Sequence, residues 1–235
     1  LKQGVAELFS NLDIEEYREF FRNKNKKQIC KITTVKQAIS EHVQNGDYIA
    51  IGGFGCNRIP TSLLHEIVKQ GKKDLGLSGH TATHDGQILA AGECFNRADI
   101  AYVVGLEARG LSKNYRKMFE SGKVKCTEWS NAALAWRYKA AAMGIPFMPA
   151  RVLMGTDTFT YSAAKEIECP FTKKKLLALP ALYPDVALIH VHRADKYGNC
   201  QIDGIIMSDN DLCKASKRVI ITTEKLISNE EIRED

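Results

Sequence analysis

The chain has 235 residues, 44% of them hydrophobic and 26% charged, a balance that excludes an intrinsically disordered protein. Its 33 Lys and Arg residues against 28 Asp and Glu give a net charge of +5, which suits an anionic small substrate, but they are too dispersed to predict nucleic-acid binding. No apolar run approaches the ~18 residues of a membrane span, and the 7 cysteines are scattered, so we expect a cytoplasmic protein without membrane partner, disulfide framework or zinc site.

Residues 5–22 carry apolar side chains at helical spacing, and a polar run over residues 22–28 follows them. We therefore expect residues 1–28 to form an N-terminal helical appendage that packs on the domain or on a partner. Residues 29–235 would then form the main domain. Because the chain starts at Leu1 and stops in a charged run, we also expect it to be part of a longer protein.

Short apolar runs alternate with helical stretches through the main domain. Helices are expected at residues 33–46, 60–71, 114–122 and 130–144. Strands are expected at residues 48–54, 74–79, 100–105, 151–155, 176–181, 186–192 and 218–224. This alternation predicts an α/β fold with a mostly parallel central sheet and helices on both faces. Residues 158–175 are the least regular and are expected to form a surface excursion.

A glycine-rich segment directly follows the strand expected at residues 48–54, with Gly52, Gly53, Gly55 and Arg58 in sequence. A strand, a glycine loop and a helix are typical of dinucleotide-binding folds, but Arg58 stands where that fingerprint has its third glycine, and no acidic residue ends the next strand. No Gly-Lys-Ser or Gly-Lys-Thr occurs, which excludes a P-loop. Three interpretations remain: dinucleotide binding, which these departures disfavour, a tight turn, or a turn whose backbone amides approach a ligand beside a fixed positive charge.

Several stretches together resemble the A (alpha) subunit of family I coenzyme A transferases, most closely the glutaconate CoA-transferase type. They follow one another in the family's order and span about residues 29 to 235. The matching pieces are residues 35–60, 63–75, 114–131, 140–149, 175–199 and 218–235. Family members continue past the point where this chain stops, so the resemblance implies that a C-terminal part of the domain is missing.

The resemblance implies transfer of CoA between an acyl-CoA and a carboxylic acid. In the family, a glutamate attacks the thioester, forms an acyl anhydride and then a glutamyl-CoA thioester, and passes CoA to the new acid. That glutamate lies in a Glu-Asn-Gly or similar motif of the B subunit, and no Glu-Asn-Gly occurs here. The resemblance therefore implies a chain that is inactive alone, a B-subunit partner, an A2B2 hetero-oligomer, and coenzyme A as substrate with no cofactor. Glu93, Glu107 and Glu128 match no nucleophile motif and are interpreted as surface or structural carboxylates.

The start of the helix expected at residues 130–144 is the candidate catalytic element. Ser130 is a natural N-cap and Asn131 falls in the first turn, where free N–H groups and the positive helix end coincide. In the family, a glutamine of the transferases falls on Asn131 and serves as an oxyanion donor, whereas related steroid-ring hydrolases carry a glutamate. An amide donates to an oxyanion, while a carboxylate would repel it but could activate water. Asn131 thus favours transfer over hydrolysis, and simple helix capping is the competing interpretation.

Two further segments are candidate substrate-binding elements by resemblance. In the family the GGFG segment, here Gly52, Gly53, Phe54 and Gly55, lies beside the acyl and CoA site. Arg58 would then pair with a carboxylate or a CoA phosphate, and an exposed basic residue at a helix start is the competing interpretation.

The second segment, residues 77–87, occupies the place of an active-site loop of the family, so Ser78, Gly79 and His80 are expected to line the acyl pocket. His80 and His84 are four residues apart, but no third ligand accompanies them, so no metal site is predicted. His190 and His192 are expected to form a satisfied core pair on one face of a strand.

Three other functions compete with CoA transfer. The same fold with another B-like partner would give acyl-CoA hydrolysis or ring cleavage, and a chain without a B partner would be a non-catalytic CoA-binding protein. A nicotinamide oxidoreductase is the most distant alternative.

Overall fold

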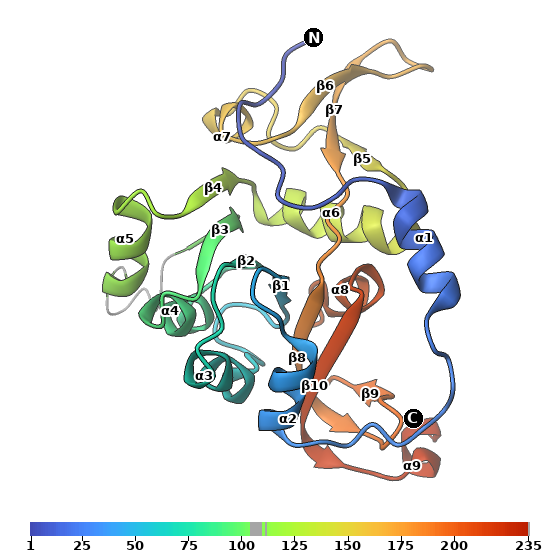
Figure 1. The fold of residues 1–235 in the computed structure, drawn as a ribbon. Coiled ribbons are helices and arrows are strands. Elements are labelled where there is room, and N and C mark those ends of the chain that lie inside the picture. The colour runs from blue at the N-terminus through green and yellow to red at the C-terminus, as the bar shows by residue number, and fades with distance from the viewer. Residues whose placement is uncertain (104–109, 111, 235) are drawn as a thin grey trace.

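The computed structural model describes residues 1–103, 110 and 112–234, and its centre is a mostly parallel sheet (Figure 1). The strand order is β10-β8-β1-β2-β3-β4, and every neighbouring pair along this path is parallel. The short strand β9 pairs antiparallel with β8. The bounds are β1 Tyr48–Ile51, β2 Leu75–Gly79, β3 Phe95–Ile100, β4 Lys125–Glu128, β8 Val186–Ala194, β9 Cys200–Gln201 and β10 Arg218–Leu226.

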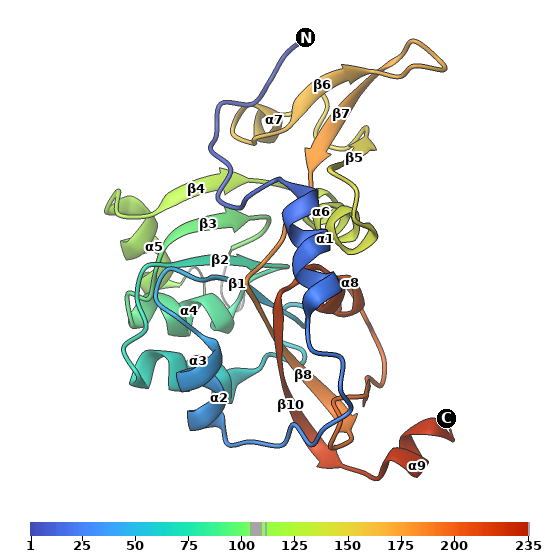
Figure 2. The same cartoon turned by 45° about the vertical axis from the view of Figure 1, so that its right-hand side comes forward.

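Helices cover both faces of this sheet, as Figures 1 and 2 show. The side chains of β1 alternate between the two layers: Ile49 and Ile51 join the core under α2, α3 and α4, whereas Tyr48 and Ala50 join the core under α6 and α8. The predicted α/β architecture is confirmed. The bounds are α2 Val35–His42, α3 Thr61–Lys69, α4 His84–Ala91, α5 Lys113–Glu120, α6 Asn131–Met143, α8 Asp209–Ala215 and α9 Asn229–Arg233.

A second, antiparallel sheet stands beside the first, with the order β5-β7-β6. Its strands are β5 Phe147–Ala150, β6 Lys165–Glu168 and β7 Lys175–Pro180, and the short helix α7 Asp157–Thr160 precedes β6. The segment at 158–175 is not irregular as expected, because it contains part of α7 and β6, but residues 170–175 are exposed, in agreement with a surface excursion. The strand expected at 151–155 was wrong, because residues 152–155 form a turn. Of the strand expected at 100–105, β3 contains only the first residue, and residues 104–105 lie outside the described part.

The N-terminal segment is only partly helical. Helix α1 covers Ile14–Asn23, where Tyr17 stacks on Tyr183 with ring centroids 3.9 Å apart. Before it, the chain runs extended beside the small sheet, with the Gly4 N–H donating to Ala164 O at 2.9 Å. A Cβ on Gly4 would lie 2.0 Å from Ser162 O, so this segment is seated too closely for a helix. The expected helix at 5–22 was wrong over its first half.

A buried polar network fixes α6 against the sheet. The Asp99 carboxylate on β3 accepts from the Arg137 guanidinium of α6 at 2.5 Å and from Trp129 Nε1 at 2.6 Å, and also from the Tyr48 hydroxyl. Asp99 and Arg137 are fully buried, and the guanidinium lies 4.1 Å from the centroid of the Trp129 ring. Low dielectric strengthens these contacts, so the start of α6 has a defined place at the end of β4.

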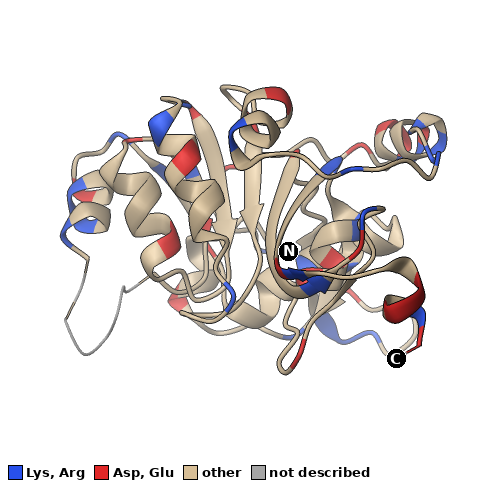
Figure 3. Ribbon diagram, turned by 90° about the horizontal axis from the view of Figure 1, so that it is seen from below, with Lys and Arg blue, Asp and Glu red and all other residues tan. Residues whose placement is uncertain are grey.

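Outside the core, charges of both signs are interspersed over helices and loops in the view of Figure 3. Among the described residues, no helix combines the length and apolar character of a bilayer-crossing segment.

Candidate active site

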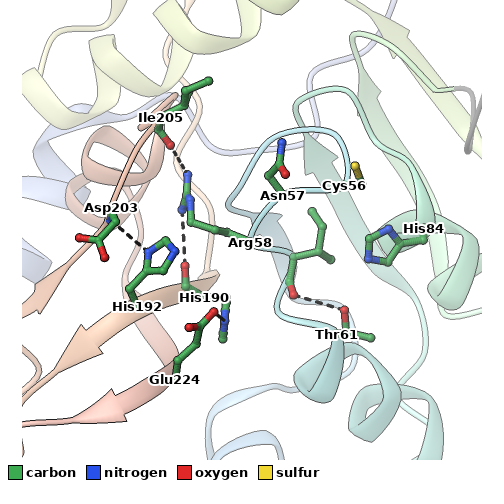
Figure 4. A pocket seen from close by; sticks show the side chains of 11 residues that line it. Cys56, Asn57, Arg58, Thr61, His84, His190, His192, Asp203, Ile205 and Glu224 are labelled. Atoms are coloured by element: carbon green, nitrogen blue, oxygen red, sulfur yellow. Dashed lines mark hydrogen bonds and ion pairs between the residues drawn. The ribbon is translucent and has the colours of Figure 1, made fainter.

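The site lies where the chain reverses direction across the sheet. From β1 the chain passes through α3 to β2 on one side, and from β8 it passes through α8 to β10 on the other side. Because β1 and β8 are neighbours, their carboxyl ends open a crevice of the kind that binds ligands in α/β folds. A cavity of about 610 Å³ occupies this place. Its walls include Cys56, Asn57, Arg58, Thr61, His84, His190, His192 and Glu224 (Figure 4).

The first two glycines after β1 lack side chains because other atoms of the protein lie too close to the positions that Cβ atoms would take. A Cβ on Gly52 would lie 2.6 Å from Asp209 Oδ1, and one on Gly53 would lie 2.5 Å from Asn57 O. The Gly53 N–H donates to Asp209 Oδ1 at 2.9 Å, with φ of +82°. Gly55, with φ of +61°, has nothing within 4 Å of its Cβ position, so only this part of the turn offers open space.

Arg58 pairs with a carboxylate of the chain itself. Its guanidinium donates to Asp209 at 3.1 Å and 2.9 Å, and also to Ile205 O at 2.7 Å. The side chains of Arg58 and Asp209 are only 9% and 3% exposed. The exposed-residue interpretation was therefore wrong, and a substrate anion would have to compete with Asp209 for this cation.

The segment after β2 is buried and well connected. Ser78 Oγ accepts from the Tyr138 hydroxyl of α6 at 2.7 Å, and Gly79 is buried at the end of the strand. His80 is 4% exposed, and its Nε2 lies 2.8 Å from the hydroxyl of Ser208, the residue before α8. Burial lowers the pKa of His80 to about 4, although a contact with Asn131 and the charge of Asp209 raise it. The imidazole is therefore neutral at physiological pH.

The start of α6 has the predicted cap. Ser130 Oγ accepts from the Ala133 N–H at 3.1 Å, which leaves the N–H groups of the first two residues without an intrahelical acceptor. The Asn131 side chain donates from Nδ2 to Thr81 Oγ1 at 3.1 Å. Thr81 has a φ of +47°, a strained conformation for a β-branched residue.

Residues 80–83 and the start of α8 contact both Asn131 and the glycine turn, and so connect the two predicted parts of the site. Asn131 bonds to Thr81, and the Thr83 hydroxyl donates to Gly55 O at 2.6 Å. On the other side, Ser208 contacts His80 while its neighbour Asp209 binds the glycine turn and Arg58. The oxyanion candidate and the glycine turn, far apart in sequence, thus share one edge of the sheet.

Other predicted residues take different places. His190 and His192 do not lie in the core but on the cavity wall, where His190 Nδ1 pairs with Thr222 Oγ1 at 2.9 Å and His192 Nδ1 accepts from the Asp203 N–H at 3.0 Å. The Glu93 side chain is 51% exposed, Glu128 is half-buried, and Glu107 lies outside the described residues. Within the described ranges, no group of three or more His, Cys, Asp or Glu residues is arranged to hold a metal ion.

The residues that sequence reasoning missed are Ser208, Asp209 and Thr81. Ser208 precedes and Asp209 begins a short helix that was not expected. Their partners lie 128 to 156 residues away in the chain, so no local pattern marks them.

Sequence comparison finds relatives that cover most or all of the chain. The chain is 48% identical over 236 residues to a protein of Archaeoglobus fulgidus, covering 100% of this chain and 53% of that protein. It is 33% identical to the A subunit of glutaconate CoA-transferase from Acidaminococcus fermentans, covering 88% of this chain and 70% of that relative. It is 34% identical to the A subunit of 3-oxoadipate CoA-transferase from Pseudomonas knackmussii, covering 86% and 72% respectively. The chain thus spans about half the length of the Archaeoglobus relative.

The fold comparison agrees with these identities. The crystal structure of glutaconate coenzyme A-transferase from Acidaminococcus fermentans matches with a TM-score of 0.83 and 32% identity over 87% of this chain and 70% of that chain. A family model described as Coenzyme A transferase matches residues 32–235. The chain therefore belongs to the family I coenzyme A transferases and is related to their A subunits.

Proposed function

We propose that this chain is the A-type part of an enzyme that moves CoA from an acyl-CoA to a carboxylic acid, with CoA as a substrate rather than a resident cofactor. The nucleophile is a glutamate on a B-type partner, and the two chain types form an A2B2 hetero-oligomer in the cytoplasm. The observation that carries the proposal is the Asn131 amide at the start of α6, set beside the His80 segment and the glycine turn.

The proposed chemistry separates two roles. The partner's carboxylate oxygen attacks the thioester carbonyl, the C–S bond breaks, and the CoA thiolate leaves an acyl anhydride. The thiolate then attacks the glutamyl carbonyl and releases the first carboxylic acid, and the reverse sequence with the second acid yields the new acyl-CoA. Each attack places negative charge on a carbonyl oxygen, and this chain supplies the hydrogen-bond donors that stabilise it.

The donors suit that task because they are fixed before the reaction. The first-turn N–H groups of α6 lie at the positive end of a 13-residue helix that Asp99 and Arg137 hold against the sheet. The second N–H of the Asn131 amide is available beyond the one given to Thr81. A carboxylate in this position would favour water activation instead, so the amide favours transfer over hydrolysis.

Dicarboxylic acids are the acceptor class to test first. The two named relatives act, by their names, on glutaconate and on 3-oxoadipate, and both molecules carry two carboxylates.

The test uses the full-length protein with its B-type partner, purified together and separately. Acetyl-CoA is mixed with glutaconate, with 3-oxoadipate, with a monocarboxylic acid or with no acid, and the acyl-CoA products are separated. We expect a new acyl-CoA only with both chains and an acceptor acid. Release of free CoA without any acid would make the complex a hydrolase, and CoA exchange by this chain alone would refute the proposed division of roles.

A further inference from the structure

The inference concerns two buried polar atoms, one on Asn131 at the start of α6 and one on His80 after β2. Asn131 Oδ1 and His80 Nδ1 are both buried, and neither meets the strict geometry of a hydrogen bond with any described residue. Asn131 Nδ2 binds the hydroxyl of Thr81, the residue after His80, and the contact of the Asn131 side chain with His80 raises the pKa of His80 against the larger lowering by burial. A carbonyl oxygen and a protonated ring nitrogen are complementary, so a hydrogen bond between them would satisfy both atoms.

The other ring nitrogen of His80 decides which tautomer is available. Its Nε2 lies 2.8 Å from Ser208 Oγ. Ser208 occupies the N-cap position of α8 but makes no capping hydrogen bond with its side chain, so its hydroxyl is committed to His80. When that hydroxyl donates to Nε2, the proton of the neutral ring resides on Nδ1, facing Asn131.

The Asn131 amide then has an anchor on each side. Thr81 Oγ1 accepts from Nδ2 at 3.1 Å. On the other side, a proton on the otherwise unpaired Nδ1 of His80 would give the unpaired Oδ1 a donor. An amide without the second anchor can turn over and exchange its oxygen and nitrogen, because the two ends have nearly the same shape. In the turned orientation the amide oxygen would face the developing oxyanion and repel it.

We propose that His80 is a positioning residue, which as the Nδ1–H tautomer held by Ser208 orients the Asn131 amide so that its free N–H faces the reacting carbonyl. This role rests on the proposed function, and it replaces direct substrate contact as the interpretation of His80. His80 would thus act without touching the substrate, by fixing the orientation of Asn131, which does touch it.

Two amide substitutions at His80 distinguish the role of its Nδ1 from that of its Nε2. In His80→Asn the side-chain amide nitrogen takes the place of Nδ1, and in His80→Gln it takes the place of Nε2, so only the first variant preserves a donor for Asn131. Both are made in the full-length protein bound to its B-type partner. We expect His80→Asn to keep kcat within about threefold, whereas His80→Gln lowers kcat by about 10²-fold, the cost of one misdirected oxyanion donor. KM for acyl-CoA and acid should change by less than about threefold in both.

Other results would overturn the proposal. A His80→Gln enzyme that keeps its kcat, or that raises KM with kcat unchanged, would indicate no role or a direct substrate contact. Equal losses in both variants together with a lower melting temperature would indicate a structural histidine.

A second measurement does not depend on turnover. Nitrogen-15 NMR of the histidine side chains in the complex reports which ring nitrogen carries the proton, and we expect a neutral Nδ1–H ring for His80 that shifts in Ser208→Ala. A proton on Nε2 would refute the proposal. If the complex transfers no CoA but the tautomer is as expected, the proposed function fails while the orientation of Asn131 by His80 stands.

Discussion

At the scale of single residues, Asn131 combines three sources of positive potential: its own amide, the first-turn N–H groups and the helix end. None of the three requires reorganisation when charge develops on a substrate. Replacing the amide by a carboxylate of the same shape therefore tests electrostatics with little change in packing.

Asn131→Asp should lower kcat by about 10²–10³-fold, because a fixed donor becomes a negative charge beside the oxyanion. Steady-state kinetics of the complex with its B-type partner would measure this. Asn25→Asp, at an exposed position before α2, is the matched control and should leave kcat unchanged. An Asn131→Asp enzyme with full transferase activity would remove Asn131 from the mechanism.

Asp85, at the start of α4, gives the stability a pH dependence. Burial raises its pKa to about 6, although backbone hydrogen bonds, including one from the Thr83 N–H at 2.7 Å, lower it. Because the folded pKa lies above the unfolded value, the native state binds the proton more tightly. The resulting stability is complete below about pH 4 and is lost as pH rises through about 6.

Relative to Asp85→Asn, the unmodified chain should therefore gain about 2.4 kcal/mol of unfolding free energy between pH 7 and pH 4. Urea unfolding at several pH values would measure the difference, with the exposed Asp157→Asn as control. Parallel curves for the chain and for Asp85→Asn would contradict the raised pKa.

Sequence alone predicted the residues whose role is local. Ser130 and Asn131 were recognisable because a capping residue and an apolar helix pattern adjoin in the chain. The partners of Arg58 and His80 were not, because contacts across more than 100 residues leave no trace in spacing.

At the scale of elements, helices with clear boundary signals and strands with continuous apolar runs were the most predictable. Helix α3 has apolar residues at helical spacing, α6 lies between the Ser130 cap and Gly144, and β1 and β8 begin with apolar runs. Strands β4 and β6 are short, and Lys or Glu occupies most of their exposed positions, so tertiary pairing rather than propensity determines them. Helix α8 is only 7 residues long, yet it positions much of the site.

Removing the charge of Asp209 at the start of α8 should destabilise the fold strongly. Asp209→Asn leaves the Arg58 guanidinium buried with an incomplete pair, so we expect a loss of about 3–5 kcal/mol in unfolding free energy. Glu120→Gln removes the exposed pair with Arg116 on α5, where the side chains are 67% and 63% exposed, and should cost less than about 1 kcal/mol. Urea titrations would compare both variants, and equal small losses would show that the Arg58–Asp209 pair adds little.

At the scale of the whole molecule, residues 1–28 are seated on both sheets rather than detached. Leu8 and Phe9 pack against the core under α6, and Tyr17 joins a cluster with Ala140 and Tyr183. The sequence predicted a helix here but not the extended portion, since the pairing of residue 4 with residue 164 is again distant in the chain.

Deleting residues 1–28 should lower the unfolding free energy by at least about 3 kcal/mol, because it removes five packed apolar side chains and exposes the apolar surface that they cover. Thermal unfolding of the full-length protein with and without the segment would measure this. Phe171→Ser, at a position 92% exposed, is the control and should change little. An unchanged melting temperature after the deletion would make the segment a dispensable appendage.

The position of Asp209 in the chain also affects how the site is made on the ribosome. The glycine turn is synthesised before its partner, because the Asp209 carboxylate that binds both Gly53 and Arg58 lies 156 residues after the first and 151 residues after the second. Until residue 209 has been synthesised, the turn lacks this carboxylate and Arg58 lacks its counter-ion. A product truncated before α8 would carry β1, β2 and α6 without the Asp209 contacts that hold the glycine turn and Arg58 in place.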